Sequence, residues 1–244
     1  MDVKKIDIHA HATTLYEFYP LRKADDPHSK LLSPEILIDF YDRLNVEKGV
    51  LLPVVSPEGQ YSTITSEACK FITEKYPDRF IWFCNIDPRS GANKPDFDFS
   101  VMLEHYKSLG ARGVGEITAK IYADDPRLDN LFSCCEEYDM PVTIHISPSE
   151  EVGSYGIIDE IGLPRLEKML KKHPKLKVFG HSQPFYAEIS SDITEELRNR
   201  FPKGKVQEGR IATLMREYEN LYCDLSAGSG ANAMQRDPEY AVRI

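Results

Sequence analysis

The sequence predicts an α/β fold in which one domain, residues 1–244, forms a TIM-like (β/α)8 barrel. Short runs of β-branched and aromatic residues alternate with longer amphipathic runs along the 244 residues. This alternation predicts a parallel sheet with helices outside it, either closed as a barrel or open as a doubly wound sheet. A single barrel commonly takes roughly 250 residues, so we expect one barrel domain.

The strands are predicted from short apolar runs bounded by turn residues. They lie near residues 3–9, 48–55, 80–87, 111–117, 141–146, 177–182 and 221–226. The last of them ends near Ser226, and Asp237-Pro238 begins a further helix, so the eighth strand of a barrel is missing before Ile244. Because an open barrel leaves two strand edges uncovered, we expect the sequence to be truncated before that strand.

The helices are predicted from the amphipathic runs between these strands. They lie near residues 34–45, 62–76, 95–109, 127–138, 163–173 and 210–218. Proline suits the first turn of a helix, because its missing N–H has no partner there. Three of the predicted helices begin in this way, at Ser33-Pro34, Asp125-Pro126 and Leu163-Pro164.

The connections between these elements differ in length on the two sides of the sheet. Links from helix to strand are a few residues long, whereas links from strand to helix run over about 12–32, 147–162 and 182–209. In parallel α/β proteins the carboxyl ends of the strands carry the catalytic groups. The long links therefore predict a functional site at that end, where 183–209 would act as a lid.

The composition excludes several kinds of protein. A net charge of -9 and a pI near 5.3 give no basic footprint for nucleic acid. No apolar run approaches the ~20 residues that cross a bilayer, so we expect no membrane contact. The five cysteines are an odd number without a disulfide pattern. With no room for a cleavable leader before the first strand, they indicate a cytoplasmic protein.

Four histidines lie at the carboxyl ends of predicted strands. His9 and His11 are two residues apart at the end of the first strand, so their side chains point to the same side of it. Such a pair alone is more often a chance His-x-His on a surface strand than a metal site. His145 and His181 end two other strands. Burying four imidazoles together costs free energy unless hydrogen bonds or a metal compensate, so we predict a metal site.

Acidic and polar residues at other strand ends complete the candidate site. Glu116 ends the fourth predicted strand among small and apolar residues, which suggests a metal ligand, although an ion pair with Lys120 or Arg112 is the alternative. Asp224 closes the seventh strand and is a weaker ligand candidate, assigned to catalysis. Ser226 and Lys120 are the candidate substrate contacts. The turn at 228–230 opens a helix whose N–H groups suit an anionic group.

These motifs resemble the amidohydrolase superfamily. The resemblance rests on His-x-His at 9–11, Thr-Ile-His at 143–145, Phe-Gly-His-Ser at 179–182 and Asp-Leu-Ser at 224–226. It is strongest for the amidohydrolase 2 group, which includes decarboxylases of the aminocarboxymuconate semialdehyde type. The resemblance implies a divalent metal, usually zinc, on His9, His11 and His145. It leaves His181 either as an acid/base group or, with Glu116 as a bridge, as ligand of a second ion.

The resemblance also implies a metal-binding aspartate on an eighth strand, which this sequence lacks. We expect a metal-dependent hydrolase in which metal-activated water attacks a C–N or C–O bond of a small-molecule substrate. A nonoxidative decarboxylase on the same scaffold is the nearest alternative, and a non-catalytic metal-binding or ligand-binding barrel is the second. A phosphodiesterase is the least favoured, because the chain is acidic. Assembly into a homo-oligomer is left open.

Overall fold

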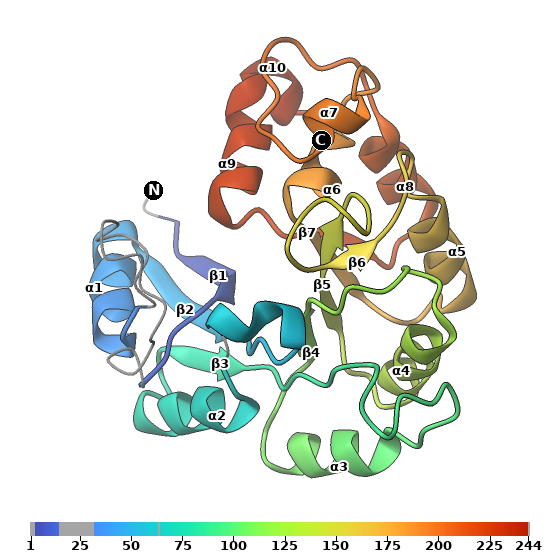
Figure 1. Cartoon of the computed structure of the whole chain (residues 1–244). Helices are drawn as coiled ribbons and strands as arrows, with labels where there is room; N and C mark the ends of the chain where they lie inside the picture. Colours follow the sequence, from blue (N-terminus) through green and yellow to red (C-terminus); the bar gives the residue numbers. More distant parts are fainter. Residues whose placement is uncertain (1–2, 15–31, 63, 244) are drawn as a thin grey trace.

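The computed structural model of the protein describes residues 3–14, 32–62 and 64–243 (Figure 1). Most of the first long link predicted from the sequence, residues 15–31, lies outside the described residues. In Figure 1 helices surround the strands, which lie at the centre of the molecule. Within the described ranges, no helix has the length and apolar character needed to cross a bilayer.

The strands are parallel and follow one another around the centre. β1 (Lys5–Ala10), β2 (Val46–Leu51) and β3 (Phe80–Trp82) form one sheet, and β4 (Val114–Ile117), β5 (Val142–Ser147), β7 (Val178–His181) and β8 (Leu221–Cys223) form another. A parallel bridge between Cys84 and Val114 joins the two. The order β1 to β8 is that of a barrel wall. Among the described residues, nothing pairs β8 with β1.

The outer helices are α1 (Pro34–Leu44), α2 (Ser66–Lys75), α3 (Ser100–Ser108), α4 (Pro126–Glu137), α5 (Pro164–Lys172) and α8 (Arg210–Glu217). Four of these six begin within one residue of the predicted start, whereas α2 and α3 begin four and five residues later than predicted. Proline occupies the first turn of α1, α4 and α5, and the side chains of Ser33 and Asp125 accept hydrogen bonds from backbone N–H groups of the turns that follow. The predicted proline starts of α1, α4 and α5 are therefore confirmed, and Ser33 and Asp125 act as N-caps.

The long links contain structure that the sequence pattern did not predict. A short strand, β6 (Ile157–Ile158), pairs with β5, and η2 (Pro57–Ser62) is a 3-10 turn after β2. The segment predicted as a lid holds α6 (Gln183–Ala187) and α7 (Glu195–Arg198). Four of the five residues of α6 are buried, so this part of the link belongs to the core. α9 (Ala227–Arg236) and α10 (Pro238–Ala241) follow β8.

A fully buried arginine fixes α7 against the link between β5 and α5. The Arg198 guanidinium donates hydrogen bonds to the backbone oxygens of Asp159 at 2.6 Å and Glu160 at 2.8 Å. It also forms an ion pair with the buried Glu188, with 3.3 Å between Nε and Oε1. One cation thus joins the link that holds Asp159 and Glu160 to the later link that holds Glu188 and α7.

Replacing Arg198 by alanine is expected to lower the free energy of unfolding by about 3–5 kcal/mol, because the buried Glu188 carboxylate loses its ion-pair partner and keeps only the hydrogen bond from the backbone N–H of Gly162. Chemical denaturation measures this change. Arg200→Ala is the matched control, since Arg200 is exposed and should contribute at most about 0.5 kcal/mol. Equal stability of the two variants would contradict the role assigned to Arg198.

Candidate metal centre

The predicted ligands converge at the carboxyl ends of the strands. His9 belongs to β1, and His11 follows that strand directly. β5 and β7 are paired so that His145 and His181 are neighbours across the sheet. A cavity of about 350 Å³ opens between these ends, and its lining includes His9, His11, Glu116, His145, Tyr155, His181 and Ser226. The structure thus brings together side chains from four separate strands.

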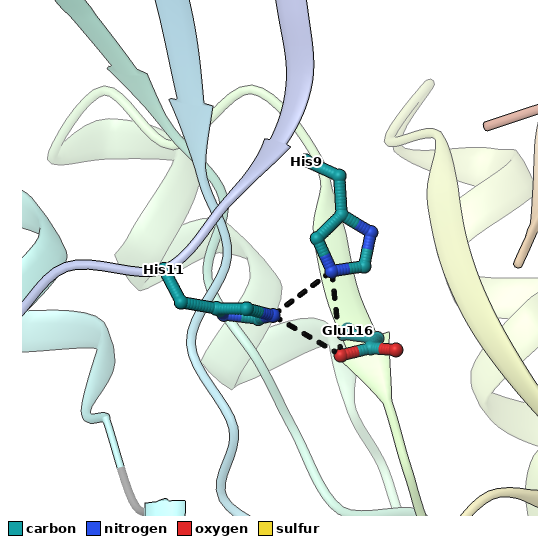
Figure 2. A group of neighbouring side chains, drawn as sticks. All are labelled: His9, His11 and Glu116. Atoms are coloured by element: carbon teal, nitrogen blue, oxygen red, sulfur yellow. Dashed lines mark hydrogen bonds and ion pairs between the residues drawn. The ribbon is translucent and has the colours of Figure 1, made fainter. Parts of the chain in front are cut away.

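His9, His11 and Glu116 point their ligand atoms at one another (Figure 2). The Nε2 atoms of the two histidines are 2.9 Å apart. Oε2 of Glu116 lies 3.5 Å from Nε2 of His9 and 3.4 Å from Nε2 of His11. Glu116 is buried and pairs with these histidines, not with Lys120 or Arg112.

The outer ring nitrogens of this pair are held by hydrogen-bond acceptors. Nδ1 of His9 is 2.5 Å from Oδ2 of Asp224, and Nδ1 of His11 is 2.9 Å from the backbone oxygen of Leu52. A neutral imidazole that donates from Nδ1 has its lone pair on Nε2. With this tautomer on both rings, two nitrogen lone pairs and a carboxylate oxygen face one point, and this arrangement suits a cation between them.

Without a metal, the pKa values of His9 and Glu116 also indicate a positive charge at this point of the site. Burial lowers the pKa of His9, but Glu116 and Asp224 outweigh it and raise that pKa to about 10. Burial raises the pKa of Glu116, but His9 and His145 outweigh it and hold that pKa well below its usual range. A proton on His9 thus supplies the positive charge that the site requires. The donor set of two imidazoles and a carboxylate suits a divalent ion in the same place.

Glu116 also belongs to a second group of donors. Its other oxygen, Oε1, is 2.6 Å from Nδ1 of His145, and ligand atoms of Glu116, His145 and His181 lie within 4.8 Å of one another. A third group of His9, His181 and Asp224 meets the same distance. The two oxygens of one carboxylate are therefore shared between two clusters of imidazoles.

His181 stands beside the cluster in its neutral form. Its Nδ1 lies 3.2 Å from the hydroxyl oxygen of Ser226 and 3.7 Å from Oδ2 of Asp224. Burial, together with the positive charge of His9, lowers the pKa of His181 to about 4. This imidazole is therefore neutral at neutral pH, and its free nitrogen can take up a proton that it holds only weakly and so returns readily to a leaving group.

The remaining predicted residues are placed less directly. Lys120 donates hydrogen bonds to the backbone oxygens of Val152 and Gly153, and it is not among the residues that line the cavity, so its substrate contact stays a prediction. Ser226 does line the cavity. Sequence reasoning missed Tyr155, whose ring packs on that of His145 with 4.6 Å between centroids. No periodicity or motif marks this residue, which lies in a link.

Comparison with known proteins gives the family and the fold class of this chain. A family model described as amidohydrolase matches residues 6–244. No match was found among curated protein sequences. An uncharacterised TIM-barrel protein from Bordetella bronchiseptica is 17% identical with a TM-score of 0.63, and the alignment covers 99% of this chain and 80% of that one. This likeness confirms the α/β fold as TIM-barrel-like.

Two further solved structures have names that state a reaction. A 5-carboxyvanillate decarboxylase from Novosphingobium aromaticivorans, complexed with manganese and a nitrobenzoic acid, is 18% identical with a TM-score of 0.56, over 97% of this chain and 83% of that one. A probable 2-pyrone-4,6-dicarboxylic acid hydrolase from Acinetobacter baumannii is 14% identical with a TM-score of 0.53, over 99% of this chain and 90% of that one.

Proposed function

We propose that this chain, an enzyme that belongs to the amidohydrolase family, uses a divalent metal ion to hydrolyse a C–N or C–O bond of a small-molecule substrate. The observation that carries the proposal is the convergence of Nε2 of His9, Nε2 of His11 and Oε2 of Glu116. These three residues would hold the principal ion. Glu116, His145 and His181 form a second group, which would bind a further ion less tightly.

Zinc is the ion that we propose, because imidazole and carboxylate donors suit it, although manganese accompanies one structural neighbour. When bound, such an ion lowers the pKa of a water molecule and polarises a substrate carbonyl oxygen. Asp224 holds His9 in the tautomer that presents Nε2 to the ion. His181 accepts a proton from the attacking water and passes it to the leaving group.

The second candidate function is nonoxidative decarboxylation in the same cavity. It is supported by the neighbours, since a 2,6-dihydroxybenzoate decarboxylase and a 5-carboxyvanillate decarboxylase both share this fold. In that reaction His9, His11 and Glu116 would keep their roles. His181 would deliver a proton to the carbon that loses the carboxylate. The two reactions differ in their products and can be separated by assay.

A substrate panel with two readouts tests the proposal. Zinc-loaded protein is expected to release acid from at least one small amide, lactone or ester, and to release no CO2 from hydroxybenzoates. CO2 release without ester, lactone or amide cleavage would establish the decarboxylase instead. Repeated silence of metal-loaded protein in both assays would contradict both functions and favour a non-catalytic metal-binding barrel.

The cellular setting is proposed from the cysteines. Cys69, Cys84, Cys134, Cys135 and Cys223 are all free thiols. Free thiols are typical of a reducing compartment, so we place the enzyme in the cytoplasm. Its proposed partner is the small-molecule substrate, and nucleic acid is disfavoured by the net charge of -9.

A further inference from the structure

A second cavity adjoins the metal cavity. It has a volume of about 230 Å³ and shares His145 and Tyr155 with the larger one. Ser147 lines it from the end of β5 and Ser154 from the link that follows, and Gln183 and Asn199 line it from the segment that holds α6 and α7. Gln183 comes two residues after His181, so the wall of this cavity is tied to the strand end that carries the proposed proton acceptor.

The second cavity offers no free charge to a ligand. The residues that line it include no carboxylate, lysine or arginine. Two cations lie behind its walls and are already bonded: Lys120 to the backbone oxygens of Val152 and Gly153, and Arg198 to those of Asp159 and Glu160. An anionic group there would meet no unpaired cation.

The cavity does offer unused hydrogen-bonding groups. In the described part of the chain, the side-chain amides of Gln183 and Asn199 and the hydroxyl of Tyr155 make no hydrogen bond. Each amide carries two donors and an acceptor, and the hydroxyl provides one of each. These groups match a ligand that both donates and accepts.

We propose that the second cavity is a specificity subsite for an uncharged polar group of the substrate, such as a carboxamide or hydroxyl. This inference rests on the proposed function, because it places the reacting end of the substrate in the metal cavity. Tyr155 lines both cavities and contacts the substrate where it passes from one to the other. A substrate with a second carboxylate at its far end is disfavoured, since that charge would be desolvated without a partner.

Binding of three matched probes to the zinc-loaded protein tests the subsite. The probes are 4-carbamoylbenzoate, terephthalate and 4-methylbenzoate, which share a benzoate for the metal cavity and differ only in the opposite group. Calorimetry is expected to show that 4-carbamoylbenzoate binds about tenfold more tightly than either of the others, because one or two net hydrogen bonds supply roughly that factor. Gln183→Ala should abolish this preference.

Control variants separate the subsite from general damage. Gln207→Ala, an exposed glutamine elsewhere, should keep the tenfold preference. Asn199→Ala should reduce the preference and serves in place of Gln183→Ala if that variant does not fold. Equal binding of the probes, no binding, tighter binding of terephthalate, or a preference that survives both substitutions would overturn the proposal. Because binding does not require turnover, a silent substrate panel with an intact probe preference would overturn the proposed function alone.

Discussion

Replacing either His9 or His11 by alanine is expected to remove the bound metal and to lower kcat/KM by at least about 10³-fold. Each substitution deletes one of the two nitrogens that face Oε2 of Glu116. A catalytic ion is worth several kcal/mol of transition-state stabilisation, and each 1.36 kcal/mol is a factor of ten. Elemental analysis of the purified variants measures the metal, and the substrate identified from the panel measures kcat/KM.

His105→Ala is the matched control for this pair. His105 is exposed on α3, away from the strand ends, so its loss should change neither metal content nor activity. Circular dichroism confirms that all three variants are folded. Full metal content in both His9→Ala and His11→Ala would remove the pair from the site and with it the basis of the proposed function.

The fold and the histidines of the site could be predicted because both depend on local patterns. Alternation of strand and helix implies a parallel sheet, and a parallel sheet brings residues such as His145 and His181 to one edge wherever they end a strand. The prediction needed no knowledge of long-range contacts. The proline starts of α1, α4 and α5 could be predicted for the same reason.

The partners of those histidines could not be predicted, because they depend on tertiary contacts. The backbone oxygen of Leu52, which fixes His11, leaves no trace in the sequence. The sequence marks Asp224 as a weaker ligand candidate with a catalytic role, and its hydrogen bond to Nδ1 of His9 depends on the tertiary structure. β6 is only two residues long and α6 only five, too short for a periodic pattern to emerge. Tyr155 lies in the link between β5 and β6, and the second cavity is lined by this link and by the segment that holds α6 and α7.

Glu116→Gln is expected to lower metal affinity about as much as loss of His9, because Glu116 is the residue shared by both donor groups. Glutamine keeps the shape of the buried side chain but presents no negative charge to His9, His11 or His145. Competition with a chelator of known affinity measures the change. The same variant is expected to lose kcat/KM by about 10³-fold.

Comparing His181→Gln with Glu116→Gln distinguishes the roles of the two donor groups. It leaves the His9, His11 and Glu116 group intact, so the principal ion should stay bound while proton transfer fails, with kcat falling by about 10²- to 10⁴-fold. If the second group also holds an ion, His181→Gln should lose that one alone, and Glu116→Gln should lose both. Retention of the principal ion by Glu116→Gln would show that the carboxylate is not a ligand of that ion. Its interaction with His9 would then be one of charge balance.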